Sequence, residues 1–164
     1  MVARDGGRPL LIEVQALVDP TRFATPRRVA QGVDSNRLSL LLAVMSRHGG
    51  LVLGDHDVYV NLVGGLQITE TATDLPLALA LASSLRGTPL AGTLVAFGEL
   101  GLTGEVRPVP YGEERLRELH KQGYVRAILP RKNCPRAGVE GLTLQPVSTL
   151  AEALAAAFQP ASAR

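Results

Sequence analysis

The sequence is short of the residues on which several classes of site depend. It holds one cysteine, Cys134, which excludes an internal disulfide and a zinc site built from several cysteines. It has no tryptophan, three tyrosines and three phenylalanines, so aromatic platforms for stacking bases are poorly supplied. The glycine-rich loops GxxxxGKS/T and GxGxxG are also missing, and we therefore expect no ATP held in that way.

Long apolar runs are missing too. No stretch reaches the length of a membrane span, and the N-terminal sequence MVARDGGRPL contains no apolar signal-peptide core. We expect a cytoplasmic protein without membrane contact. Hydrophobic residues make up 46% and charged residues 20% of the chain, as in folded globular domains. The net charge of +2 permits a polyanionic partner, but scattered solvated charges account for it equally well.

The apolar patterns predict one mixed α/β domain over residues 9–158, with a flexible segment at 1–8 and a disordered tail at 159–164. Strands are expected at 9–18, 93–100, 125–130 and 142–147, with one strand or a strand pair within 51–68. Helices are expected at 34–48, 75–85, 112–122 and 148–158, and a basic loop at 19–33. Residues 98–109, GELGLTGEVRPV, are typical of a hairpin.

Residues that often carry chemistry have ordinary explanations here. Asp55, His56 and Asp57 are adjacent in a turn, where side chains point in different directions, so a polar turn is favoured over a metal site. Most serines lie within or at the ends of expected helices, where they act as caps. Cys134 lies in the basic loop RKNCPR, and nearby cations lower a thiol pKa, but a lone loop cysteine is weak support for catalysis.

The order of elements resembles the proteolytic domain of Lon proteases. A strand region ending in Gly-Gly leads through ETATD into a buried helix ending SSLRG, and the hairpin from Gly98-Glu99 to Val109 follows. The resemblance covers roughly residues 9–158. It implies the Lon proteolytic-domain-like fold (ribosomal protein S5 domain 2-like), a mixed sheet packed with helices.

Lon proteases use a serine at the start of the buried helix and a lysine in the helix after the hairpin. Aligned on these motifs, the serine position holds Ala72 and the lysine position holds Glu113. Neither member of the Ser-Lys dyad is present, so we expect a scaffold without peptidase activity. Thr71 and Thr73 offer hydroxyls nearby, but no lysine or histidine base is placed beside them. Glu113 is expected to pair with Arg115 or Arg117 or to cap its helix.

The longer segments PRRVAQGVDSNRLSLLLAVMSRHGG, DVYVNLVGGLQITET and GEVRPVP resemble the C-terminal domain of the RadA (Sms) family of bacterial DNA-repair proteins. That resemblance implies a hexameric ring, binding of single-stranded or branched DNA, and branch migration in homologous recombination alongside the recombinase RecA. The family's zinc motif and ATPase core are missing here, so ATP, Mg and Zn are expected only in parts that precede this domain, and no cofactor or metal within it.

Within this resemblance, the chemistry of phosphate recognition selects DNA-contact candidates. Arginine binds phosphate bidentately, and a helix N-terminus offers free N–H groups. The first set is Arg27, Arg28, Asn36 and Arg37; a weaker second set is Arg131, Lys132 and Arg136. Pairing of Arg27 or Arg28 with Asp34, or with an acid across a subunit interface, is nearly as well supported.

Two further interpretations remain open. One is a residual hydrolase that uses Thr71, Thr73 or Cys134. The other is an assembly domain with no DNA contact of its own.

Overall fold

In the computed structural model, which describes residues 1–159, an open three-stranded sheet forms one half of the molecule. It consists of β3 (Val14–Pro20), β5 (His56–Leu62) and β4 (Arg28–Gln31), in that order. β3 runs antiparallel to β5, and β4 runs parallel to it. Alternate residues Val58, Val60 and Leu62 are buried, as expected for strands with one covered face.

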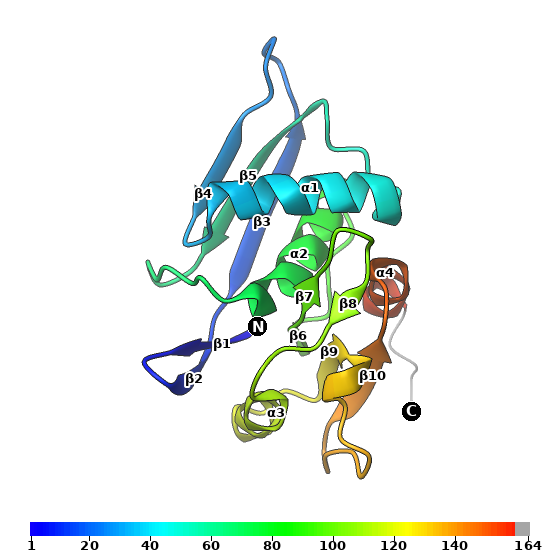
Figure 1. The fold of residues 1–164 in the computed structure, drawn as a ribbon. Helices are drawn as coiled ribbons and strands as arrows, with labels where there is room; N and C mark the ends of the chain where they lie inside the picture. Colours follow the sequence, from blue (N-terminus) through cyan, green and yellow to red (C-terminus); the bar gives the residue numbers. More distant parts are fainter. Residues whose placement is uncertain (160–164) are drawn as a thin grey trace.

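Two helices cover the inner face of this sheet (Figure 1). α1 (Ser35–Gly49) begins where the Asp34 side chain accepts a hydrogen bond from the Arg37 N–H, and it ends at Gly50 in the left-handed conformation. α2 (Asp74–Arg86) follows the short 3-10 helix η1 (Thr71–Thr73), and most of its residues are buried. The predicted helices at 34–48 and 75–85 are therefore confirmed.

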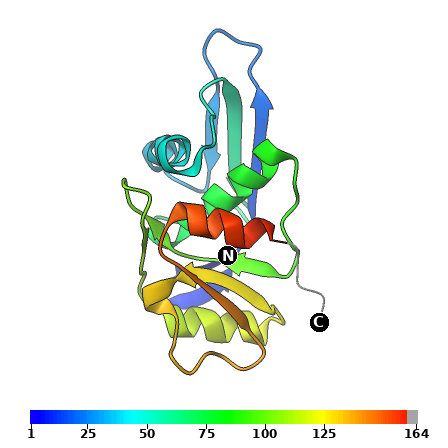
Figure 2. The same ribbon diagram turned by 90° about the vertical axis from the view of Figure 1, so that its right-hand side faces the viewer.

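The other half is built on a parallel sheet of β10 (Thr143–Val147), β9 (Arg126–Pro130) and β6 (Leu94–Ala96). Helix α4 (Leu150–Phe158) contacts α1 and α2, and Figure 2 shows α2 and α4 between the two sheets. Helix α3 (Gly112–Lys121) packs at the opposite end, and η2 (Arg131–Asn133) follows β9. One half of the expected capping box of α4 is present, since Thr149 Oγ1 accepts the Glu152 N–H. The Glu152 carboxylate accepts the N–H of Ser148, the residue before the cap, in place of the Thr149 N–H.

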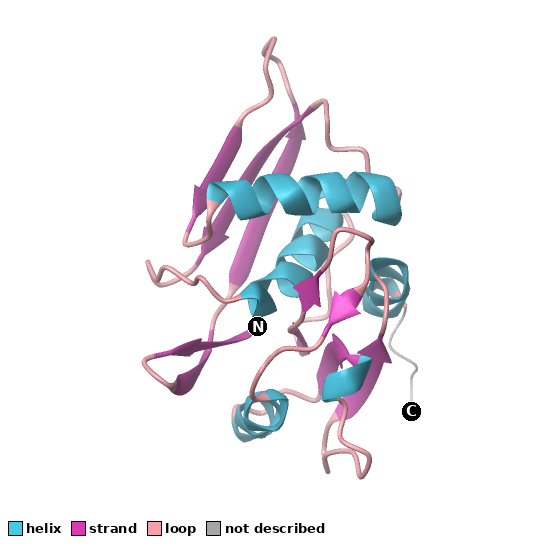
Figure 3. Cartoon of the chain, in the orientation of Figure 1, coloured by secondary structure: helices cyan, strands magenta, loops and turns pink. Residues whose placement is uncertain are grey.

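Two antiparallel hairpins complete the fold (Figure 3). β7 (Glu99–Leu100) pairs with β8 (Val106–Arg107), which confirms the hairpin predicted at 98–109. β1 (Val2–Asp5) pairs with β2 (Arg8–Leu11). The mixed α/β class predicted from the sequence is confirmed.

Several local expectations need correction. Residues 1–8, expected to be flexible, contain β1 and the start of β2, because Val2 and Ala3 are buried against the core. The basic loop 19–33 contains β4, which gains its hydrogen bonds from β5. Of the two alternatives for region 51–68, the single strand is confirmed, since β5 pairs with β3 on one edge and with β4 on the other. Of the tail predicted to be disordered, 160–164 lies outside the described residues.

Candidate functional site

Ala72 occupies the position that corresponds to the Lon serine, and it is almost completely buried. Its exposed fraction is 1%, within an apolar cluster that includes Phe97 and Val109. The Ala72 carbonyl accepts a hydrogen bond from Gly98 N–H at 3.1 Å, and the Gly98 carbonyl accepts one from Leu75 N–H at 3.0 Å. The segment that would carry a nucleophile is thus closed off by the chain leading into β7.

Glu113, at the lysine position, lies in a different environment. It is in the first turn of α3, its side chain is 73% exposed, and it pairs with Arg117 at 3.4 Å. This is the helical ion pair that the sequence predicted as one of three options. Alanine has no nucleophilic atom and glutamate has no amine, so the Ser-Lys pair is missing at these two positions.

The largest fully buried side chain near this junction is Arg115, with an exposed fraction of 1%. Its Nη1 and Nη2 donate to Glu70 Oε1 at 3.1 Å and Oε2 at 2.6 Å. The remaining donors reach the carbonyls of Val2 at 2.5 Å and Pro110 at 3.1 Å. Each of the three guanidinium nitrogens therefore has at least one partner, as a buried cation requires.

A second ion pair, between the partly buried Arg37 and the fully buried Asp74, joins α1 to the start of α2. Arg37 donates to both carboxylate oxygens of Asp74, with Nε at 2.9 Å from Oδ1, and Asp74 Oδ2 also accepts from Leu100 N–H at 3.0 Å. The hydrogen bond to Asp74 raises the pKa of Arg37. Burial raises the pKa of the Asp74 carboxyl, and the hydrogen bonds from Arg37 and Leu100 oppose that shift.

The nearby hydroxyls donate to groups of the protein itself. Thr71 Oγ1 donates to Glu99 Oε2 at 2.6 Å, and the other oxygen of Glu99 takes Arg107 Nη1 at 3.3 Å. Thr73 Oγ1 donates to the Glu70 carbonyl at 2.9 Å. A carboxylate is a far weaker base than a lysine amine, so these contacts favour a structural role.

The first set of DNA-contact candidates does not form one cluster. Arg28 donates to the carbonyls of Leu53, at 2.9 Å, and His56. Arg37 is held by Asp74, as described above. Asn36 is exposed in the first turn of α1. Arg27 is also exposed, and its guanidinium lies 3.8 Å from the centre of the Phe23 ring. Arg28 is exposed as well, so what distinguishes Arg27 and Asn36 is that their side chains are exposed and donate no hydrogen bond to the described residues.

The second set is divided in the same way. Arg131 Nε donates to Ser148 Oγ at 2.9 Å, and Nη2 donates to the Pro146 carbonyl at 3.1 Å. Lys132 and Arg136 are exposed on either side of Cys134, whose side chain is partly buried against the apolar cluster around Phe97.

Of the three residues predicted to share a turn, only Asp55 lies in one; His56 and Asp57 begin β5, and the three side chains show no metal geometry. His56 Nδ1 lies 2.7 Å from Asp55 Oδ1, whereas Asp57 accepts the Arg27 N–H at 2.7 Å. Within residues 1–159, no group of three or more histidine, cysteine, aspartate or glutamate side chains is arranged to hold a metal ion. No helix in the same part of the chain is long and apolar enough to cross a membrane.

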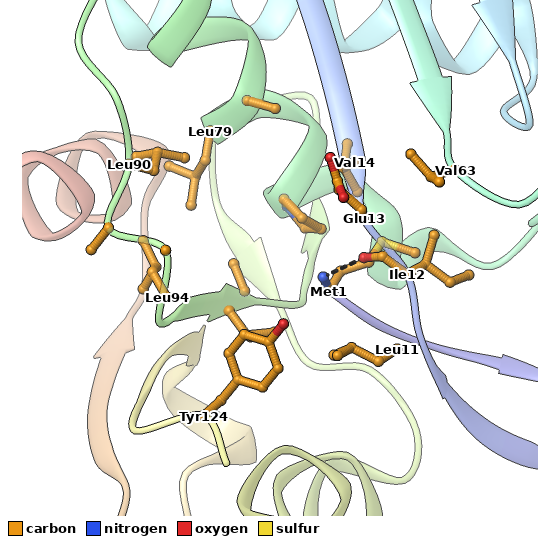
Figure 4. A pocket seen from close by; sticks show the side chains of 16 residues that line it. Met1, Leu11, Ile12, Glu13, Val14, Val63, Leu79, Leu90, Leu94 and Tyr124 are labelled. Carbon is orange, nitrogen blue, oxygen red and sulfur yellow. Dashed lines mark hydrogen bonds between the residues drawn. The ribbon is translucent and has the colours of Figure 1, made fainter. Parts of the chain in front are cut away.

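A cavity of about 670 Å³ opens between the β2–β3 junction, α2 and the chain before β6 (Figure 4). Apolar side chains such as Ile12, Leu79 and Leu94 line it, with Glu13 and Tyr124 as polar members. Neither Ala72 nor Glu113 lines it. The cavity is therefore separate from the degenerate dyad.

Comparison with known proteins identifies the family of the chain. Residues 38–133 match the model of the family described as subunit ChlI of Mg-chelatase. The chain belongs to the ChlI family. The matched range runs from α1 through η2, so it contains the buried helix, the hairpin and both dyad positions. The Lon-like fold predicted from the sequence is confirmed by this membership.

The chain is also similar to bacterial proteins named DNA repair protein RadA. It is 56% identical to the protein of Salmonella typhimurium over 154 residues and 55% identical to that of Escherichia coli. It is 44% identical to the protein of Bacillus subtilis over 151 residues. These matches cover 94%, 94% and 92% of the chain, and they confirm the predicted resemblance. The chain spans about a third of the length of these relatives, 34%, 34% and 33%.

Proposed function

We propose that this chain is a non-catalytic Lon-like domain that binds DNA and associates with itself, in the service of DNA repair. The observation that carries the proposal is the pair of residues at the former dyad, a buried alanine at 72 and an exposed glutamate at 113. Proteolysis needs a nucleophile and a base in contact, and this pair supplies neither. The proposed binding of DNA is supported by the relatives, which are named DNA repair proteins.

The wider proposal follows the same relatives. The full-length protein would be a DNA-dependent ATPase and helicase that assembles as a hexameric ring in the cytoplasm and drives branch migration in homologous recombination alongside the recombinase RecA. ATP, Mg and Zn would bind in its other parts. The described domain would contribute assembly and DNA contact, through Arg27 and Asn36 of the first set and Lys132 and Arg136 of the second.

The outer face of the β3–β5–β4 sheet supports self-association. Leu17 and Val29 both lie opposite Tyr59 in the strand register, so the three form one row across the sheet. Leu17 is 57% exposed, where a solvated sheet face would carry a polar residue. No lysine or arginine lines the groove of about 290 Å³ on this face, so it suits a protein better than DNA. We assign it to a second copy of this chain.

The test of DNA binding is titration of the chain with single-stranded, duplex and branched oligonucleotides over a salt series. We expect binding that weakens as salt rises, because phosphate contacts release counterions. Failure to bind any of the three at low salt would overturn the DNA part and leave assembly as the function of this domain.

Assembly is tested separately by the mass of the chain in solution. Leu17→Glu is expected to lower that mass by placing a charge in the interface, whereas Val52→Glu, at another exposed apolar position, is expected to leave it unchanged. A monomeric wild-type chain would overturn the assignment of this face.

A residual hydrolase is tested with an electrophilic probe directed at hydroxyl and thiol nucleophiles. We expect no labelling. Labelling that disappears in Thr71→Ala, Thr73→Ala or Cys134→Ala would instead establish a hydrolase.

A further inference from the structure

The loop between β3 and β4 extends beyond the end of the sheet, away from the other half of the molecule (Figures 1 and 2). It carries Phe23, which is 50% exposed although nothing in the fold requires an apolar ring there. An isolated exposed apolar residue needs no explanation. Phe23, however, lies under the Arg27 guanidinium at 3.8 Å from the ring centre, which fixes the ring and leaves half of its surface open.

The loop is braced at both ends. Thr21 N–H donates to the Asp55 carbonyl at 2.9 Å, and Thr21 Oγ1 accepts the Phe23 N–H at 3.2 Å. On the returning side, the buried Asp57 carboxylate accepts the Arg27 N–H at 2.7 Å. The ring and the guanidinium are therefore presented in a defined arrangement, which lowers the entropy lost when a ligand binds.

The charges around the loop decide what kind of ligand suits it. Arg22, Arg27 and Arg28 lie in the loop or at its end, but Asp19, Asp55 and Asp57 lie at the same end of the sheet. The three positive and three negative formal charges sum to zero, and the Arg28 guanidinium also donates to backbone carbonyls. Phosphate attraction alone is weak here, so a ligand must also use the face of the ring.

From these observations we propose that Phe23 and Arg27 form a binding site for one unpaired nucleobase of single-stranded nucleic acid. The base stacks on the open face of Phe23, and Arg27 and Arg22 contact the adjoining phosphates. The inference rests on the proposed DNA binding and specifies its strand form and its contact residue. Bases paired within a duplex cannot reach the ring, so single strands are preferred.

The absence of tryptophan allows a direct test. Phe23→Trp places the only indole of the chain at the site. The 164-residue variant is titrated with a thymidine oligonucleotide of about 12 nucleotides, with the uridine RNA of equal length, and with an abasic oligonucleotide of equal length that offers phosphates alone. Stacking predicts quenching of the indole by the first oligonucleotide and little by the abasic one. The RNA arm shows whether the site discriminates DNA from RNA, which here differ in the 2′-hydroxyl and in the methyl group of thymine.

Phe23→Leu then measures how much the ring contributes. We expect its affinity for the thymidine oligonucleotide to fall about 5- to 100-fold. We also expect the logarithm of affinity to fall with the logarithm of salt with a slope of only about one to two, because few phosphates are neutralised. Tyr111→Leu is the matched control, since Tyr111 is also exposed and lies under Arg4 at 3.7 Å, but Arg4 is already paired with Glu114.

The outcomes separate this inference from the proposed function. If the chain binds the oligonucleotide without quenching Phe23→Trp, or if Phe23→Leu and Tyr111→Leu lose affinity equally, the site is overturned and DNA binding stands. Equal quenching by the abasic oligonucleotide also overturns stacking. If no nucleic acid binds to the wild-type chain, both proposals are overturned.

Discussion

The buried Arg115 forms an ion pair with the partly exposed Glu70, and the pair joins α3 to the segment before Ala72. Two hydrogen bonds, at 3.1 and 2.6 Å, connect the guanidinium to the carboxylate. The same carboxylate accepts Arg4 N–H at 2.8 Å, so it also binds the β1–β2 hairpin. Polar groups next to the degenerate dyad thus hold three parts of the fold together. This arrangement explains how the junction is ordered through contacts that do not involve the side chains of Ala72 and Glu113.

Arg115→Met is expected to destabilise the chain strongly. Removal of Arg115 leaves the Glu70 carboxylate, which is 24% exposed, with only the Arg4 N–H, and it takes the donor from the Val2 and Pro110 carbonyls. The loss is expected at the low end of the range of about 3–5 kcal/mol for a broken buried pair. Chemical denaturation followed by circular dichroism measures the loss. Arg117→Met is the matched control, because Arg117 is exposed and its pair with Glu113 is worth less than about 0.5 kcal/mol. Adding Glu70→Gln to Arg115→Met should restore part of the stability, and a double variant no better than Arg115→Met would contradict this account.

Restoring the dyad residues is not expected to restore proteolysis. Ala72→Ser places a hydroxyl where the exposed fraction is 1%, and Glu113→Lys places an amine on an exposed helix turn. Neither side chain gains a partner of the kind that activates a nucleophile. A fluorogenic peptide assay on the double variant should therefore match the wild-type background. Turnover above that background, lost again in Ala72→Ser alone, would show that the site retains catalytic geometry.

Local features of the fold could be predicted from the sequence. Asp34 as the cap of α1 and the hairpin between Glu99 and Arg107 are confirmed, because each depends on residues a few positions apart. Strand β4 was missed because its hydrogen bonds come from β5, about thirty residues away. The position of β1 was missed for a similar reason, since Val2 is buried by packing on distant elements.

The candidate site also contains features that could be predicted from the sequence and features that could not. Its two degenerate positions follow from motif alignment, and the structure gives them a buried and an exposed environment. The ion pair between Arg37 and Asp74 could not be predicted from the sequence. A basic residue at a helix N-terminus gives the same sequence pattern whether its side chain faces solvent or a buried acid. One signal was present: Asp74 begins a helix that is otherwise almost wholly apolar, and a buried carboxylate requires a cationic partner.

Acid stability should depend on Asp57. The Arg27 N–H lowers the pKa of the Asp57 carboxyl, with a further contribution from Thr21. Because the pKa of Asp57 is lower in the folded state, its ionised form stabilises the fold. This stabilisation is fully present above the unfolded-state pKa of about 3.9, and it is lost as the pH falls through the folded-state pKa. Urea midpoints measured from pH 7 to pH 2.5 should therefore decline less steeply below pH 4 in Asp57→Asn. Asp19→Asn, at the paired and exposed position, should keep the wild-type decline.

Gly104 is a glycine of the Lon-like hairpin, and its replacement is expected to be costly for two separable reasons. Its φ of +80° is strained for other residues, and an added Cβ would lie 2.7 Å from the His48 Cβ. Gly104→Ala should therefore lose about 2–4 kcal/mol of unfolding free energy. Gly65→Ala isolates the backbone contribution, because its φ is +70° and nothing lies within 4 Å of the added Cβ.

The expected loss for Gly65→Ala is about 1 kcal/mol. The difference between the two variants then measures the contact between the hairpin and the end of α1. Adding His48→Gly to Gly104→Ala should recover that difference, apart from the cost of glycine near the end of the helix. Equal losses in Gly104→Ala and Gly65→Ala would show that the hairpin is free to move away from α1, and that strain alone accounts for the glycine.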